Sequence, residues 1–268
     1  MRIWQQSSLD ISRLPGYAGF MGRHVGNVCS PDVEVETHGI ETGTLTREEY
    51  FKYSGYGEHL KVVQIIENAL RAEREGCDAV AISCFLDSGL EEARAALSIP
   101  VVSTFETVLE VAARTGNAVA LVTRASHMND RINELIRRYG HQRMVVDHVT
   151  LDFPMSLLEL EAAYQGSREF VEQFRRQAQS LIRAGADVIV PAEGVLNTVL
   201  VENGVVEVDG VPVIDSYGTL MAYAEMMVRL RRRQGATRKG DKPPEQVAAQ
   251  LRTATAALLV RPCGSPAS

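Results

Sequence analysis

Short apolar segments alternate with longer amphipathic segments along most of this chain. The short segments predict β-strands; they lie at 1–4, 79–83, 101–104, 118–123, 188–192 and 211–215. The longer segments have apolar residues at helical spacing, and each ends in glycine, a common helix terminator; they lie at 59–76, 105–116, 127–140, 167–185 and 216–235. Nearly continuous apolar strands between helices are typical of a parallel sheet covered on both faces. We therefore predict an α/β fold with three-layer architecture.

Two segments depart from this pattern. Residues 198–211 place Asn203 and Gly204 between β-branched residues, which predicts a β-hairpin with a tight turn. Residues 235–268 begin with a polar, proline-containing stretch and continue with apolar residues at helical spacing. We interpret this second segment as a linker, an extra helix and a tail. The extra helix contacts either another subunit or its own subunit.

The chain contains an internal repeat. GCDAVAISCF at 76–85 and GADVIVPAEG at 185–194 each follow a helical segment and carry an acidic residue two positions after the glycine. A proline-led strand follows each copy, in SIPVVST at 98–104 and GVPVIDS at 210–216. Two similar α/β units predict two lobes with pseudo-twofold symmetry and a cleft between them.

We expect the following lobe boundaries. The first lobe is expected to comprise residues 1–112 together with 214–234, and the second lobe residues 113–213. The closing helical segment would then return to the first lobe.

The repeat also indicates a reactive site. Cys84 and Glu193 stand eight residues after the two repeat glycines, at the ends of their strands. Ligands of parallel sheets bind beyond the carboxyl ends of the strands, so symmetry would bring both side chains to one cleft. A thiol that precedes a helix gains thiolate character from the helix NH groups. The alternatives are that Cys84 only packs in the core and that Glu193 lies on a solvated loop.

Composition narrows the class of partner. The net charge is -6, which argues against nucleic acid or an anionic membrane surface as a partner and favours a small-molecule substrate. No apolar run approaches the roughly 20 residues of a membrane-spanning helix, and we expect a cytoplasmic protein. The cysteines show no CxxC pair, and the histidines form no metal constellation with the carboxylates, so we expect no metal.

Four segments carry a family resemblance. They are EGCDAVAISCFLDSGLEEAR at 75–94, GNAVALVT at 116–123, GADVIVPAEG at 185–194 and VPVIDSYGTLMAYAE at 211–225. Over residues 1 to about 234 the chain resembles the aspartate/glutamate racemase superfamily, and most closely its hydantoin racemase branch. The resemblance implies two Rossmann-like lobes with a cleft between them, no cofactor, and a homo-oligomer. It also implies one catalytic cysteine from each lobe. Cys84 matches the first, and Glu193 stands in place of the second.

This departure leaves two reactions open. In the first, Cys84 and Glu193 act as acid and base on opposite faces of a small cyclic ureide of hydantoin or thiohydantoin type, or a related acid, and racemise or epimerise it. In the second, Cys84 attacks the ring as a nucleophile and Glu193 activates water, which makes the protein a hydrolase or desulfhydrase. A binding protein without catalysis is disfavoured because both positions carry reactive groups.

Further polar groups at the predicted strand ends are candidates for substrate binding. Arg124 could pair with a substrate carboxylate, whereas Asp215 could instead cap the helix that begins at Ser216. Ordinary solvation is the alternative for the loop residues. The complete set of candidates is Gln6, Ser7, Phe85, Thr104, Thr123, Arg124 and Asp215.

Overall fold

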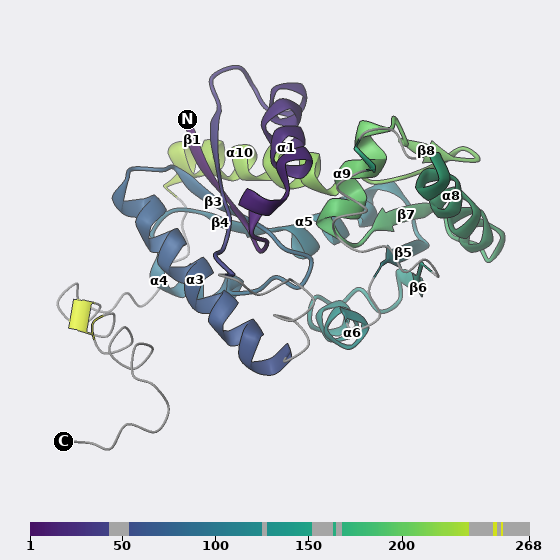
Figure 1. The fold of residues 1–268 in the computed structure, drawn as a ribbon, viewed down its shortest axis with the longest axis horizontal. Helices are drawn as coiled ribbons and strands as arrows, with labels where there is room; N and C mark the ends of the chain where they lie inside the picture. The colour runs from purple at the N-terminus through teal and green to yellow at the C-terminus, as the bar shows by residue number, and fades with distance from the viewer. Residues whose placement is uncertain are drawn as a thin grey trace.

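The computed structural model describes residues 1–42, 54–124, 128–151, 163–164, 168–235, 249–250 and 253. Within these residues the strands form two parallel sheets, which lie beside one another in Figure 1. The first sheet has the order β2-β1-β3-β4, with β1 Arg2–Ser7, β2 Glu34–His38, β3 Ala79–Ser83 and β4 Val101–Ser103. The second has the order β6-β5-β7, with β5 Val119–Thr123, β6 Val145–Thr150 and β7 Val188–Pro191. The expected α/β fold with two sheet-based lobes is confirmed.

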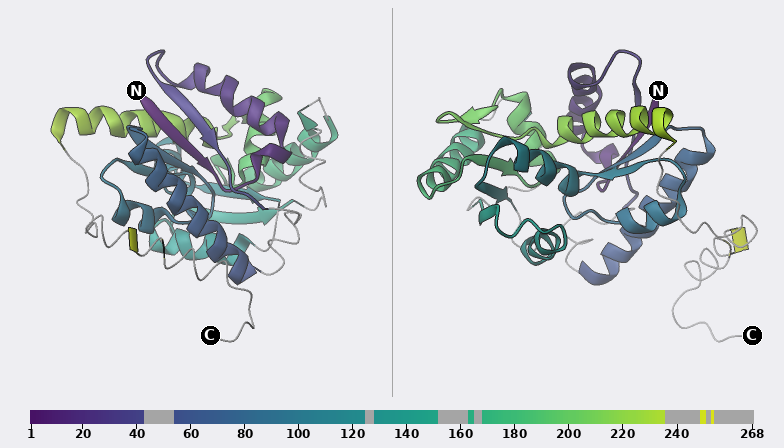
Figure 2. Two further views of the ribbon diagram at one scale, coloured as in Figure 1. Left: turned by 60° about the vertical axis from the view of Figure 1, so that its left-hand side comes forward. Right: turned by 180° about the vertical axis from the view of Figure 1, so that it is seen from behind.

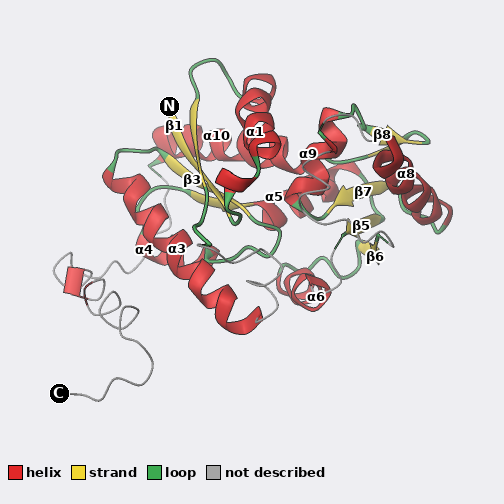
Figure 3. Ribbon diagram, viewed as in Figure 1, coloured by secondary structure: helices red, strands yellow, loops and turns green. Residues whose placement is uncertain are grey.

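Helices flank the strands in both lobes (Figure 3). They are α1 (Pro15–Val28), α3 (Ser54–Arg74), α4 (Leu90–Ala96), α5 (Thr104–Thr115), α6 (Asn129–Arg138), α8 (Arg168–Arg183), α9 (Gly194–Glu202) and α10 (Ser216–Gln234), with a short 3-10 helix η1 (Ile11–Arg13). The last long helix, α10, lies against α5 and the first sheet (Figure 2).

Strand side chains alternate between opposite faces, and this alternation separates the core into layers. Ile3 and Ala81 of the first sheet share one apolar cluster with Ala120 and Ile189 of the second, beneath α1, α9 and α10. Their chain neighbours face the other way. In the first sheet these neighbours pack under α3 and α4, and in the second under α5 and α6. One layer of the core is therefore common to both lobes.

Strands β2 and β6 were not predicted from sequence. Each lies at one edge of its sheet, and their side chains are partly exposed, whereas those of the opposite edge strands β4 and β7 are buried. Partly exposed strands lack the continuous apolar run that marks a strand buried on both faces. The other strands of the two sheets lie within two residues of most predicted bounds; β1 alone extends further, to Ser7.

The predicted hairpin at 198–211 is wrong in its first half. Residues up to Glu202 belong to α9, and Asn203 caps its end, with Gly204 in the left-handed region at φ +70°. The apolar side chains of this segment are buried at helical spacing. A smaller antiparallel hairpin follows, formed by β8 (Glu207–Val208) and β9 (Val211–Pro212), and its turn residues Asp209 and Gly210 both have positive φ.

The strand predicted at 211–215 is correspondingly shorter than expected. Beyond β9, Val213 makes only an isolated parallel bridge to Ile189 of β7. The predicted extra helix and tail at 235–268 lie almost wholly outside the described residues.

The sequence repeat has a structural counterpart at the amino ends of the sheets. Gly76 and Gly185 both adopt positive φ, at +79° and +107°. Two residues later, Asp78 accepts a hydrogen bond from the backbone N–H of Arg2 at 2.9 Å, at the start of β1. Asp187 accepts from the backbone N–H groups immediately before β5 at 2.8–3.0 Å. In each lobe, the acidic residue of the repeat therefore anchors the start of the neighbouring strand through hydrogen bonds from its backbone N–H groups.

Asp187 provides a test of this anchoring. The backbone N–H groups of Asn117 and Ala118 hold the pKa of Asp187 below its ordinary value. The substitution Asp187→Ala is expected to cost about 1 kcal/mol at neutral pH, since hydrogen bonds to a partly exposed carboxylate contribute modestly. That cost lowers the melting temperature of a protein of this size by about 2–4 °C, which thermal unfolding measures.

The pH dependence of this effect has a defined sign. A folded-state pKa below the ordinary one gives stabilisation that is complete above about pH 4 and is lost as the pH falls through the lower folded-state value. The difference between wild type and Asp187→Ala should therefore shrink in acid. Glu172→Ala on the exposed face of α8 is the control. Equal melting temperatures for both variants and wild type would contradict the anchoring role.

Candidate active site

A small pocket lies where the carboxyl ends of strands from both lobes meet. Cys84 lies directly after β3 of the first sheet, and Glu193 lies two residues after β7 of the second; both line the pocket. The cavity volume is about 40 Å³. Its lining residues come from the ends of β1, β3 and β7 and from α1, α3 and α9: Ser8, Leu9, Tyr17, Lys61, Ser83, Cys84, Phe85, Leu86, Met128, Glu193, Gly194 and Val195.

Cys84 is buried in the first wall of this pocket, with 6% of the residue exposed. Its Sγ lies 3.3 Å from Oγ of Ser88, in the loop that leads to α4. Ser88 in turn donates a hydrogen bond to Oε1 of Glu58 on α3, at 2.6 Å. The thiol is thus held by polar contacts inside the protein and is not merely packed against apolar neighbours.

Asp87 fixes the shape of the Cys84 loop. Its backbone adopts a positive φ of 45°, which is uncommon for a non-glycine residue. The buried carboxylate accepts hydrogen bonds from Ser103 Oγ at 2.6 Å and from the N–H groups of Phe105 and Glu106 at the start of α5. It also accepts from the hydroxyl of Tyr139, at the end of α6, at 2.7 Å. The loop that carries the thiol is therefore tied to elements of both lobes.

Glu193 forms the second wall and is 4% exposed. It stands at the N-cap position of α9, yet its side chain makes no capping hydrogen bond to that helix. Instead, both carboxylate oxygens accept from Arg124: Nε at 3.0 Å and Nη2 at 2.8 Å. Arg124 directly follows β5, and both side chains are largely buried. A bidentate guanidinium of this kind favours the ionised form of the carboxylate.

Tyr17 is a pocket residue that the sequence analysis missed. It lies on α1, and its hydroxyl is 3.4 Å from Ser83 Oγ. The same hydroxyl is 3.2 Å from the position that a Cβ would occupy on residue 194, so glycine at that position leaves room for it. Burial raises the pKa of Tyr17 above its ordinary value. The phenol therefore remains protonated at neutral pH and has a proton to donate in a hydrogen bond.

The sequence of α1 contains one feature from which this helix, and so the position of Tyr17, could have been predicted. Pro15 occupies the first turn, where proline is favoured, but glycines interrupt the apolar pattern that follows.

Of the predicted substrate-binding residues, Phe85 lines the pocket and Arg124 contacts it through Glu193. The others are not among the residues that the structure places in the pocket lining. Gln6 Nε2 donates to the carbonyl of Ser7, whose Oγ accepts from the N–H of Leu9. Thr104 donates to the carbonyl of Ile82. For these residues, contact with substrate stays a prediction.

The remaining two candidates also have partners in the protein. Thr123 Oγ1 lies 3.3 Å from Thr150 Oγ1 within the second sheet. Asp215 caps α10 through the N–H of Gly218 at 2.9 Å, and its other oxygen lies 2.5 Å from Nε2 of His24. The capping alternative for Asp215 is therefore realised.

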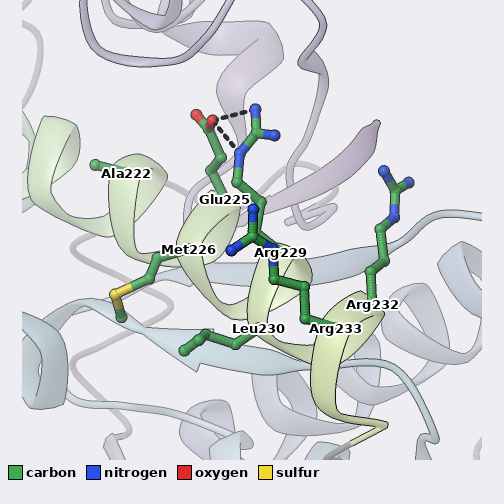
Figure 4. Close-up of a pocket in the computed structure, with 7 residues that line it drawn as sticks. All are labelled: Ala222, Glu225, Met226, Arg229, Leu230, Arg232 and Arg233. Carbon is green, nitrogen blue, oxygen red and sulfur yellow. Dashed lines mark hydrogen bonds and ion pairs between the residues drawn. The ribbon is translucent and has the colours of Figure 1, made fainter.

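A larger hollow of about 500 Å³ lies elsewhere, on the outer face of α10 (Figure 4). It is bordered by Glu225 and Arg229, which form an ion pair at 2.7 Å, and by further arginine and apolar side chains of the same helix. Neither Cys84 nor Glu193 borders it. Because Cys84 and Glu193 both line the smaller pocket, that pocket is the candidate active site.

Two negative findings concern the described residues. No helix among them is long and apolar enough to span a bilayer. Likewise, no group of three or more histidine, cysteine, aspartate or glutamate side chains in the described part of the chain is arranged to hold a metal ion.

Comparison with known proteins places the chain in a family. The family model described as Asp/Glu/Hydantoin racemase matches residues 35–224. The hydantoin racemase of Pseudomonas sp. (strain NS671) is 27% identical over 215 residues, which cover 80% of this chain and 82% of that protein.

Solved structures share the fold. The allantoin racemase from Pseudomonas fluorescens superposes with a TM-score of 0.70 at 22% identity, covering 91% of this chain and 97% of that one. The allantoin racemase from Klebsiella pneumoniae gives a TM-score of 0.69 at 21% identity, covering 88% and 89%. Because the family model spans more than half of the chain and the curated relatives that match are racemases, the chain belongs to the Asp/Glu/hydantoin racemase family and is an isomerase of that superfamily.

Proposed function

We propose that the protein racemises or epimerises a small cyclic ureide of the hydantoin type, by cofactor-independent proton transfer between Cys84 and Glu193. The observation that carries the proposal is the presence of these two groups in one pocket, each at the end of a strand from a different sheet. The substrate class is supported by relatives named as hydantoin and allantoin racemases, whose named substrates share a five-membered ureide ring. The comparisons do not favour the hydrolase or desulfhydrase alternative.

The proposed reaction uses one group on each face of the ring. In one direction, the Glu193 carboxylate takes the proton from the ring carbon, and the C–H electron pair moves into the adjacent carbonyl to give an enolate. The Cys84 thiol then gives its proton to the opposite face of that carbon, which leaves a thiolate and a carboxylic acid. The other enantiomer reacts in reverse. Inversion by proton transfer requires access to both faces.

Arg124 fits this scheme because it favours the ionised form of Glu193 before substrate binds. An ionised carboxylate is the form that can accept a proton. The thiol on the opposite wall supplies the matching acid, so the resting pocket contains one proton donor and one acceptor.

Tyr17 is proposed to donate a hydrogen bond to the enolate oxygen. Its hydroxyl stays protonated because burial raises its pKa. Donors aimed at developing negative charge in a dry site contribute strongly to the rate.

The reaction class can be tested in deuterium oxide. Wild-type protein incubated with either enantiomer of a 5-substituted hydantoin should introduce deuterium at the ring carbon and produce the mirror-image compound without a change of constitution. Nuclear magnetic resonance and chiral chromatography measure these two outcomes. A product of different constitution, or released sulfide from a thiohydantoin, without exchange at the ring carbon would contradict racemisation.

The two proposed acid/base groups can be tested separately. Cys84→Ser and Glu193→Gln are each expected to reduce the racemisation rate by about 100-fold or more, since each removes a proton-transfer group. Residual deuterium exchange should be confined to the enantiomer whose hydrogen faces the group that remains. Matched controls are Cys77→Ser, at the amino end of the same strand region, and Glu202→Gln, at the far end of α9. Full racemisation by either active-site variant would exclude that residue from the mechanism.

The role of Tyr17 predicts an effect on turnover rather than on binding. Tyr17→Phe should lower kcat by about 10-fold to 100-fold and change KM little, because the lost hydrogen bond acts mainly on the enolate. Steady-state kinetics measure this split. Tyr217→Phe is the control, because this buried tyrosine contacts the carbonyl of Met21 and is not among the pocket-lining residues. A Tyr17→Phe variant with kcat within twofold of wild type would refute the donor role.

A further inference from the structure

Lys61 is a buried cation in the wall of the active-site pocket. It lies on α3, its side chain is 1% exposed, and it lines the pocket together with Cys84. Removing an ammonium group from water is costly unless an opposite charge lies close to it. The carboxylate of Glu58, one turn earlier on α3, lies 2.5 Å from Lys61 Nζ and is one-third exposed. The proton-transfer scheme above uses neither residue.

Glu58 connects this lysine to the sulfur of Cys84. One of its oxygens pairs with Lys61, and the other accepts a hydrogen bond from Ser88 Oγ at 2.6 Å. The Ser88 hydroxyl proton is therefore engaged, and the lone pairs of that oxygen face Cys84 Sγ at 3.3 Å. The thiol thus donates a hydrogen bond to Ser88, whose hydroxyl donates to Glu58, and Glu58 is paired with Lys61.

The charges around the sulfur come from several elements. Tyr17 of α1 is buried and neutral, Glu193 at the start of α9 is paired with Arg124, and Glu58 is paired with Lys61. Both Glu58 and a Cys84 thiolate are negative, so they oppose one another when the sulfur ionises. Among the described residues that line the pocket, Lys61 is a cation that can offset this repulsion on the first wall.

We propose that Lys61, acting through Glu58 and Ser88, controls the charge on the Cys84 sulfur and so allows the sulfur to carry a negative charge after it gives up its proton. Lys61, Glu58 and Ser88 are positioning residues in this proposal. During turnover the proton leaves Cys84 for the substrate carbon, and the Ser88 hydroxyl can turn to donate to the thiolate. The importance of Lys61 for catalysis rests on the proposed function. Its effect on the charge of the Cys84 sulfur does not.

The effect on the sulfur can be measured without any substrate. Iodoacetamide reacts with the thiolate form of cysteine, with displacement of iodide, and the rate at Cys84 is followed by mass spectrometry of the peptide that contains it. Lys61→Met keeps the length of the side chain but removes its charge and leaves Glu58 without that cation. Both changes disfavour the thiolate. We expect the alkylation rate at neutral pH to fall by about tenfold or more, and its pH profile to move to higher pH.

Arg74→Met is the matched control. It removes one positive charge from the same helix, but its position is 13 residues from Lys61, or about 20 Å along the helix axis. This distance exceeds the Debye length at physiological ionic strength, so Cys84 should be alkylated at the wild-type rate. Lys61→Arg retains the positive charge and should recover at least part of the rate lost in Lys61→Met.

A double variant separates charge from disruption of the fold. Glu58→Gln together with Lys61→Met removes both charges, so no uncompensated carboxylate remains beside the sulfur. Alkylation should then be faster than in Lys61→Met alone. The inference is overturned if Lys61→Met is alkylated at the wild-type rate, or if the double variant is as slow as the single one.

The experiment also distinguishes this inference from the proposed function. If wild type fails to racemise hydantoins while alkylation responds as expected, the control of the sulfur stands and the proposed function fails. If wild type racemises hydantoins and Lys61→Met is alkylated like wild type, the proposed function stands and the inference fails.

Discussion

The carboxylate of Asp87 is buried, and its position depends on the four donors that surround it. Ser103 donates from the end of β4, two backbone N–H groups donate from the start of α5, and Tyr139 donates from the end of α6. A buried carboxylate without such partners would be costly, so the loop that contains it has little freedom. Cys84 lies three residues earlier in the same loop. The thiol is therefore held at a defined place relative to the second lobe, from which Glu193 approaches the pocket.

The two pocket walls are similar in backbone and different in chemistry. Each presents a proposed acid/base group at the end of a strand, and each contains a buried basic side chain. On one side, Arg124 contacts the carboxylate of Glu193 directly. On the other, Lys61 is separated from the Cys84 sulfur by two side chains. In the proposed reaction, direct contact suits the group that accepts the proton, and indirect contact suits the group that gives its proton up.

Sequence reasoning found the features that rest on local patterns and missed those that depend on long-range contacts. The repeat predicted two lobes, and it placed Cys84 and Glu193 at strand ends that do meet in one pocket. The helix that carries Tyr17 was missed because its glycines weaken the apolar periodicity, and strands β2 and β6 were missed because half-exposed strands are not continuously apolar. The link from Lys61 to Cys84 joins residues on different elements, so no spacing in the sequence indicates it.

The pairing of a thiol with a carboxylate has a thermodynamic consequence for a racemase. Two mirror-image substrates have equal free energies in water, so their equilibrium constant is one whatever groups the protein contains. The ratio kcat/KM must then be the same in both directions. If Cys84 and Glu193 are the two acid/base groups, as proposed, their different acidities can appear only in how each direction divides that ratio between kcat and KM. The enantiomer with the lower KM then has the lower kcat in the same proportion.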